Sequence, residues 1–288
     1  ASPKIIKDVE KLDAIIQILK QQYSPYLSAK HQTFLMAYEC AKQPDEGKLK
    51  ALVTTLKLAS DTWAKADLNF IFSFVFNQLN KLYIETRAPD LYVRLRELYT
   101  WAMDEKILFI EGVLPPSPYR NLIIICLRTA SFDQAQHYLL KLKPFLPQKV
   151  RAETFVICQA LIWIYTGEYS QILRKLGTNR FSIEPFEISA RWLIVQAHHE
   201  LYPQEIEWRL RQVEIHQRYI KSRKELLPPF QRAYLNQFRF YKRILMLKGT
   251  SHMKQVVKDL KKTNLFHNKG WLVKVIQEMS SPQSADSA

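Results

Sequence analysis

Glycine is scarce in this sequence, with 6 among 288 residues. Loops that cradle phosphate are built from closely spaced glycines, and the patterns G-x-x-x-x-G-K-[ST] and G-x-G-x-x-G are both absent. The nucleophile elbow G-x-S-x-G of α/β hydrolases is absent as well. We therefore expect a protein that is not an enzyme, with no catalytic residue and no cofactor.

Cysteine is also rare, and long apolar runs do not occur. Cys40, Cys126 and Cys158 each lie in an apolar stretch of helical periodicity, which is typical of buried thiols in a reducing compartment, so we expect a cytoplasmic protein. No run approaches the roughly 18 apolar residues of a membrane-spanning helix. Residues 1–4 include no Met and do not begin an apolar signal segment, which is typical of a piece excised from a longer chain.

No metal site is expected. The pair His198-His199 precedes Glu200, but a zinc-binding H-E-x-x-H helix would need a histidine where Pro203 stands. No cysteine or further histidine follows at the spacing that zinc ligands on one helix require. We expect one of the two histidines to pack in the core and the other to be solvated.

Proline, in contrast, is frequent, and most of the 14 prolines lie between apolar-periodic stretches. Because proline interrupts helices, this placement is typical of an all-α chain with short breaks. Hydrophobic periodicity predicts about fourteen helices. Their ranges are 4–22, 27–42, 46–60, 66–86, 89–106, 118–130, 132–143, 148–166, 169–176, 184–201, 204–223, 228–248, 252–263 and 269–279.

The strongest break is the proline cluster at residues 115–118. It predicts an N-terminal helical region over 1–117 and a more regular region over 118–279. Residues 280–288 have no apolar periodicity and are expected to form a disordered tail. A second break at 224–229 is interpreted as a linker that lets the last helices move as a separate cap.

The regular region contains a recurring helix–turn–helix. Thr129–Ala135 and Thr166–Ile172 share a small residue, a spacer, an aromatic, two polar residues and then an alanine or isoleucine. We expect the aromatics Phe132 and Tyr169 to begin the second helix and to wedge against the first. They are 37 residues apart, close to the 34-residue period of tetratricopeptide (TPR) repeats.

The first helices of these units, 148–166 and 184–201, are apolar on more than one side. A helix of this kind must be covered from two directions, which a single helical pair cannot do. The pattern therefore predicts an α–α superhelix, that is, a TPR-like solenoid in which successive pairs stack.

From Pro118 to about Leu247 the sequence resembles the C-terminal half of long, uncharacterised bacterial TPR-like proteins. The resemblance rests on Tyr119-Arg120-Asn121-Leu122, Ala130–Ala135, Leu146-Pro147, Gly167-Glu168-Tyr169, Phe186–Arg191 and Arg218-Tyr219-Ile220. It implies a scaffold and supplies no catalytic residue. Most of the consensus glycine and alanine positions of the TPR are replaced here.

Positive charge is concentrated toward the C-terminus. The chain carries a net charge of +15, and residues 226–275 contain eleven Lys or Arg against the single acid Asp259. Such asymmetry indicates an acidic partner or a polyanion. The candidate contacts are Arg239, Lys242, Arg243, Lys254, Lys258, Lys261 and Lys262.

Two plainer interpretations compete with a binding role for this region. The aromatic residues that alternate with the basic ones recur at helical spacing, which favours a core stripe over a platform for stacked bases. The lysines of 252–263 lie opposite Val256 and Leu260, which favours the solvated face of a terminal capping helix over a docking strip. The core stripe would comprise Phe230, Tyr234, Phe238, Tyr241 and Leu245.

Three functions follow, in descending order of support. The first is a protein-interaction scaffold that holds a partner segment on the concave face of the solenoid. The second is a nucleic-acid-binding module that uses the basic C-terminal third, with affinity that falls steeply with salt. The third is a hydrolase whose site is assembled across several helices.

Overall fold

The computed structural model describes residues 14–18, 20–23, 26–42, 45–86, 88–224, 226–247, 250–263 and 269–280. Within these ranges the regular structure is helical, and the only β feature is the isolated bridge between Ile110 and Val113. This confirms the predicted all-α class. Among the described helices, none combines the length and hydropathy that crossing a bilayer requires.

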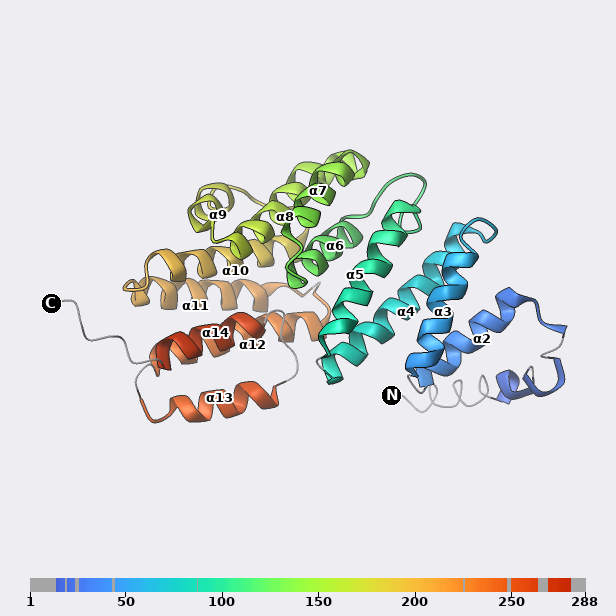
Figure 1. Ribbon diagram of the computed structural model, residues 1–288. Helices are drawn as coiled ribbons and strands as arrows, with labels where there is room; N and C mark the ends of the chain where they lie inside the picture. The colour runs from blue at the N-terminus through green and yellow to red at the C-terminus, as the bar shows by residue number, and fades with distance from the viewer. Residues whose placement is uncertain are drawn as a thin grey trace. The chain divides into compact units, whose positions relative to one another are not determined.

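The helices agree with the predicted ranges to within about three residues at each end. Residues 14–18 and 20–22 of the first predicted helix are helical, whereas residues 4–13 and 19 lie outside the described residues. Of the predicted tail 280–288, Ser280 is the last residue of the final helix, and residues 281–288 lie outside the described residues. The helices of Figure 1 are α2 (Ala29–Lys42), α3 (Glu46–Leu58), α4 (Lys65–Thr86), α5 (Pro89–Asp104), α6 (Pro116–Arg128), α7 (Phe132–Leu142), α8 (Arg151–Thr166), α9 (Tyr169–Leu176), α10 (Glu184–Leu201), α11 (Ile206–Ser222), α12 (Pro228–Met246), α13 (Met253–Lys262) and α14 (Lys269–Ser280).

Proline marks where several helices begin. Pro89, Pro116, Pro185 and Pro228 occupy the first or second position of α5, α6, α10 and α12. The proline ring fixes the backbone near helical φ, and the amide hydrogen that it lacks would have no partner in the first turn. Proline therefore starts helices in this chain as well as separating them.

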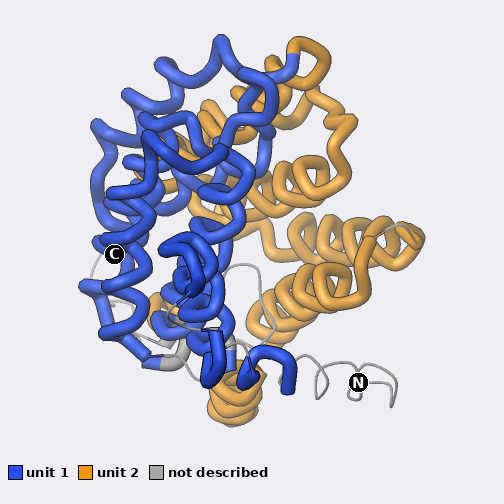
Figure 2. The backbone as a smooth tube through the Cα atoms, turned by 90° about the vertical axis from the view of Figure 1, so that its right-hand side faces the viewer, with its two compact units in different colours: residues 1–147 blue, residues 148–288 orange. Residues whose placement is uncertain are grey.

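The chain divides into two compact units, residues 1–147 and 148–288 (Figure 2). The sequence placed its main break at the proline cluster 115–118 instead. That cluster opens α6, and α6 packs against α5, so it lies within the first unit. A proline at a helix N-terminus leaves the packing of the helix unaffected, which is why the cluster does not mark the division.

In the first unit, consecutive helices pack against one another from α2 to α7, and α2 also contacts α4. Leu49, Leu52 and Leu56 form the buried stripe of α3. Between α6 and α7, the buried Tyr119 hydroxyl donates a hydrogen bond of 2.6 Å to the Leu139 carbonyl. Short connections and neighbour contacts of this kind are typical of stacked helical hairpins.

In the second unit, α10 is covered by α8, α9 and α11, and α12 contacts α11, α13 and α14. The Trp192 ring of α10 meets Phe238, Tyr241 and Trp271 edge-on, at centroid distances of 5.0, 5.8 and 5.2 Å. These edge-to-face pairs join α10, α12 and α14 into one core. Helix α13 lies along the outer side of this group in Figure 1.

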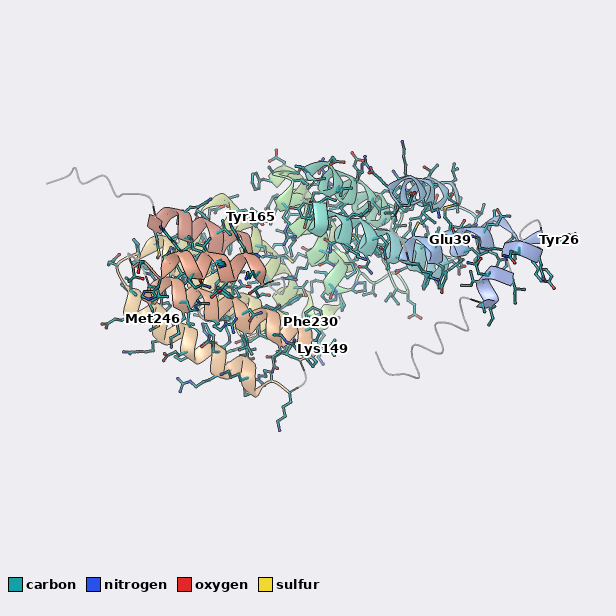
Figure 3. All side chains as sticks on the ribbon, turned by 90° about the horizontal axis from the view of Figure 1, so that it is seen from below. Tyr26, Glu39, Lys149, Tyr165, Phe230 and Met246 are labelled. Atoms are coloured by element: carbon teal, nitrogen blue, oxygen red, sulfur yellow. The ribbon has the colours of Figure 1, made fainter. Side chains whose placement is uncertain are left out.

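The predicted aromatic stripe of α12 is confirmed at four of its five positions, since Tyr234, Phe238, Tyr241 and Leu245 are all buried. Phe230 is 57 % exposed (Figure 3), because it lies in the first turn of α12, at the end of the helix. The three predicted buried thiols, Cys40, Cys126 and Cys158, are buried, and none of them forms a disulfide within the described residues.

The linker expected at 224–229 is held at its two ends. The side-chain amide of Gln231 on α12 donates to the carbonyls of Ile220 and Arg223, both at 3.1 Å. Helices α11 and α12 also pack against each other along their lengths. The described residues around this break therefore form a closed helical hairpin.

The two recurring turns match in backbone as well as in sequence. Helices α7 and α9 begin at Phe132 and Tyr169, as predicted. Before them, Ala130 and Gly167 adopt left-handed φ angles of 52° and 81°. The wedging role assigned to Phe132 is wrong because its side chain is 39 % exposed.

The residues three positions later fill the angle between the helices. Ala135 and Ile172 are both fully buried at the helix pair. A helix brings residues three apart onto one face. The aromatic at the first position of the helix lies at the outer end of that face, and the residue three positions later lies in the core.

The matched turns give a paired test of conformational strain. A left-handed backbone is strained for alanine but not for glycine, so Ala130→Gly should raise the free energy of unfolding by roughly 0.5–1 kcal/mol. Gly167→Ala should lower it by a similar amount, since open space around Gly167 leaves backbone conformation as the only cost. Urea unfolding measures both changes.

Ala51→Gly, at an exposed position inside α3, is the control. It should destabilise the protein, because glycine is unfavourable within a helix. If Ala130→Gly destabilised the protein as Ala51→Gly does, the strain assigned to Ala130 would be refuted.

Candidate functional site

The seven basic residues predicted as contacts are divided between α12 and α13. On α12, Arg239 is exposed, whereas Lys242 pairs with Glu214 at 2.6 Å and Arg243 pairs with Asp259 at 2.7 Å. The hydrogen bonds from Arg243 and Gln255 lower the pKa of Asp259. Two of the seven cations are therefore already neutralised within the chain.

The four lysines of α13 lie together on one exposed face of that helix. Lys254, Lys258, Lys261 and Lys262 are exposed, and Val256 and Leu260 on the opposite face are buried in the core. Within the described part of the chain, Lys254, Lys258 and Lys261 form no ion pair with their side chains. This strip is solvated, as the capping-helix interpretation requires.

The aromatic rings beside these cations are not available to a ligand. Phe238, Phe240 and Tyr241 are all less than 2 % exposed. Base stacking requires a free ring face, which these rings do not offer. What remains for a polyanion is the lysine strip of α13 with Arg239.

The expectation for His198 and His199 is wrong in one respect, because both side chains are buried. His198 stacks on Trp208 at 3.6 Å between ring centroids and pairs with Glu205 at 3.2 Å. His199 is hydrogen-bonded to the Tyr241 hydroxyl at 3.0 Å. Helix α10 is covered on both of the sides where these rings project, so both rings are largely shielded from solvent.

Metal-ligand clusters of three or more His, Cys, Asp or Glu side chains are absent from the described residues. The two adjacent histidines engage separate partners, and burial lowers the pKa of His198. Their surroundings are those of packed side chains with polar contacts in the core.

Helix α11 carries a further buried histidine that the sequence reasoning did not single out. His216 lies 3.4 Å from the Arg191 guanidinium through Nδ1, and its ring meets Phe238 edge-on. Burial, reinforced by Arg191, lowers the pKa of His216 to about 3. Since Arg191 can only donate, the imidazole is neutral and accepts at Nδ1.

A groove on the first unit has an apolar floor. It has a volume of about 490 Å³ and runs between α3 and α5. Leu49 and Val53 of α3, Leu79 of α4 and Leu98 of α5 line it, and Leu58 stands at its edge with 79 % of its surface exposed. An exposed leucine beside an apolar groove is a typical feature of interaction surfaces.

Charged side chains surround this floor. Arg94 of α5 pairs with Glu46 of α3 at 2.5 Å across the groove. Lys50, Lys57 and Glu97 complete the charged lining, so bases outnumber acids. An apolar centre with a charged rim is the arrangement found at protein–protein interfaces.

The sequence reasoning missed this groove because it described residues 1–117 only as helical. One signal was present: Leu58 lies on the opposite side of α3 from the stripe Leu49, Leu52 and Leu56. An apolar residue off the buried stripe is a candidate for an external contact. Its neighbours Leu79 and Leu98 come from other helices, which periodicity cannot place.

Comparison with protein-family models, with curated proteins and with solved structures gives no match to this chain. The function must therefore be argued from the residues and their geometry.

The buried neutral His216 predicts acid sensitivity. An unfolded chain binds a proton at histidine near pH 6.5, whereas the folded protein does not until about pH 3. The unfolded state therefore gains protons as the pH falls from 6.5 toward 3, and stability is lost over this window. At pH 5, His216 lowers the free energy of unfolding by about 2 kcal/mol.

Urea unfolding at pH 7 and pH 5 of the wild type and His216→Gln measures this effect. The stability difference between the two pH values should be about 2 kcal/mol smaller in the variant. His137→Gln, on the exposed face of α7, is the control and should retain the wild-type difference. An unchanged pH response in His216→Gln would show that His216 does not titrate as described.

Proposed function

We propose that this protein is a non-catalytic interaction scaffold of TPR-like solenoid type, which binds an amphipathic helix of a partner protein in the groove between α3 and α5. The observation that carries the proposal is the groove itself, with its apolar floor, charged rim and exposed Leu58. Helix-in-groove recognition uses such a surface, with apolar side chains at i, i+3 or i+4, and i+7 as anchors.

The packing of the helices supports the solenoid part of the proposal. Each helix makes its main contacts with helices one or two positions away along the chain, in both units. Solenoids have this property, because each repeat contacts only its neighbours. The left-handed turns at Ala130 and Gly167 add a repeated element, and the sequence from Pro118 onward resembles TPR-like proteins.

The charges indicate the character of the partner helix. The rim of the groove holds Lys50, Lys57 and Arg94 against Glu46 and Glu97, and the whole chain has a net charge of +15. Acidic residues beside the apolar anchors would meet favourable potential during approach and at the rim. The partner segment is therefore an amphipathic helix with an acidic polar face.

Nucleic-acid binding is the second candidate, and the exposed lysines of α13 are the observation that favours it. It ranks below the scaffold because Lys242 and Arg243 are paired and the neighbouring rings are buried. If it is correct, affinity for single-stranded RNA or DNA should fall steeply between low and moderate salt.

Phage display of helical peptides tests the scaffold proposal, with selection on the wild type and counter-selection on Leu58→Asp. Leu58 is exposed, so the substitution should cost little stability while placing a charge at the apolar edge. Peptides enriched on the wild type should carry apolar anchors at helical spacing with acidic flanks. Their affinity for Leu58→Asp should be at least about tenfold lower.

Leu140→Asp is the matched control, since Leu140 is a 55 % exposed leucine on α7 outside the groove. It should bind the selected peptides as the wild type does. Equal binding by Leu58→Asp, or anchors without helical spacing, would overturn the groove assignment. A filter-binding titration with RNA at two salt concentrations tests the second candidate separately.

A further inference from the structure

The second unit contains a cavity of about 370 Å³ between α8, α9, α10 and α14. Three aromatic side chains line it: Tyr165 of α8, Tyr169 of α9 and Trp271 of α14. Tyr165, labelled in Figure 3, is 43 % exposed, whereas Trp271 is buried. Ile164, Gln196, Glu200, Gly270 and Lys274 complete the lining.

Two polar side chains on one face of α10, Gln196 and Glu200, line this cavity. Gln196 is only 2 % exposed, yet among the described residues its side-chain amide has no hydrogen-bond partner. Glu200 lies four residues later on the same face. Its Oε1 accepts hydrogen bonds from Trp271 Nε1 at 3.3 Å and from Lys274 Nζ at 3.0 Å. Its second oxygen, Oε2, accepts no hydrogen bond from the described residues, so it is open to a donor in the cavity.

The charges around the cavity favour a cationic ligand. Lys274 is shared between Glu200 at 3.0 Å and Glu278 at 3.4 Å, so two carboxylates face one ammonium. The C-terminal turns of α8 and α10 and the N-terminal turns of α9 and α14 all contribute lining residues, so their dipoles oppose one another. The side chains therefore decide the sign: the lining holds one carboxylate and one ammonium, and Glu278, which pairs with Lys274 outside the lining, adds a second carboxylate.

We propose that this cavity binds a guanidinium group, with Gln196 and Glu200 as its hydrogen-bond acceptors and Tyr165 and Tyr169 as its aromatic walls. A guanidinium presents several N–H donors in one plane and can reach both the Gln196 oxygen and Glu200 Oε2. Its flat cation also stacks on aromatic rings, which a compact ammonium does less well.

The aromatic walls lie close to the acceptors. Burial raises the pKa of the Tyr169 hydroxyl, and the Glu200 carboxylate adds to this effect, so the Tyr169 hydroxyl lies within electrostatic reach of that carboxylate. Trp271 Nε1 fixes Glu200 from the opposite helix. The acceptors are thus held in place before a ligand arrives, which reduces the entropy lost on binding.

This inference does not depend on the groove of the first unit, and either can fail alone. The guanidinium could belong to an arginine side chain of a peptide or to a small free molecule such as agmatine. Both present the same chemistry to Gln196 and Glu200. Comparing N-acetyl-arginine-amide with agmatine distinguishes the two sources by affinity.

The test follows the indole N–H resonance of Trp271, assigned with Trp271→Phe, in a ¹H–¹⁵N NMR titration of the full chain. N-acetyl-arginine-amide should shift this resonance saturably, while the indoles outside the cavity keep their positions. N-acetyl-citrulline-amide has the same shape without the charge and should bind at least about tenfold more weakly. The lysine analogue should also bind more weakly.

Substitutions at the cavity test both the site and the sign of the ligand charge. Glu200→Gln and Gln196→Leu should each weaken binding about tenfold or more. Lys274→Met removes the competing ammonium and should tighten binding by about threefold. Tyr165→Ala should weaken binding about fivefold, since an exposed residue can be truncated without unfolding the unit.

Tyr202→Ala is the matched control, because Tyr202 is a 40 % exposed tyrosine of the same unit outside the cavity. It should bind as the wild type does. Equal shifts with citrulline and arginine analogues would overturn the proposal, as would loss of binding in Lys274→Met, which would indicate an anionic ligand. Unchanged affinity in Tyr165→Ala would also contradict the assigned cavity, even if Glu200→Gln failed to fold.

Discussion

The second unit depends on one constraint: α10 is covered from several sides, so nearly every side chain that it carries must find a place in the core. Twelve of its residues are buried, and five of these twelve have polar side chains: Glu187, Ser189, Gln196, His198 and His199. A buried polar group without a partner costs more than a hydrogen bond gains, so each of these residues constrains its neighbours.

The partners of α10 account for much of the surrounding structure. Glu187 pairs with Arg191 at 2.6 Å and accepts the Phe181 amide at 3.2 Å, which fixes the segment that precedes the helix. His199 binds Tyr241 and thereby connects α10 with α12. Helix α10 thus joins the core through polar bonds as well as through Trp192. Gln196 is the exception, and it lies in the cavity where a ligand can satisfy it.

The end of α10 is stabilised in a related way by the fully buried Arg209 of α11. Its guanidinium donates to the carbonyls of Tyr202 and Pro203 at 2.9 and 2.7 Å. Carbonyls just beyond a helix C-terminus have no partner within the helix, and a cation near them also meets the favourable end of the dipole. This one side chain therefore fixes the turn between α10 and α11, at the cost of burying a charge, and burial accordingly lowers the pKa of Arg209.

Local structure was predictable from the sequence because local rules determine it. Proline placement and the 3.6-residue period located the helices, and the turn before Tyr169 was predicted from its small residue, now seen as the left-handed Gly167. The proline cluster at 115–118 misled the division into units, since a proline that begins a helix and one that separates domains look alike in sequence. The exposed Phe132 and Phe230 show the same limit, because an apolar stripe in the sequence does not reveal how far the neighbouring helices extend along it.

The candidate sites were not predictable, since their residues meet only through packing. Glu200 and its partners Trp271 and Lys274 are 71 and 74 positions apart along the chain. The groove between α3 and α5 likewise needs α4 to supply Leu79 as part of its floor. Charge runs, in contrast, are visible in sequence, but ion pairing inside the chain had already neutralised Lys242 and Arg243. Net charge therefore could not locate a site.

The two candidate sites are built from different helices in different units. A change of side chains at α3 and α5 of the first unit alters one surface and leaves α8, α10 and α14 of the second unit as they are. The groove in the first unit is broad, with an apolar floor and a charged rim, and suits a folded segment. The cavity in the second unit is smaller, with aromatic walls and the acceptors Gln196 and Glu200, and suits a single charged group. Each site follows from the helices that form it, so the two can be altered and measured independently.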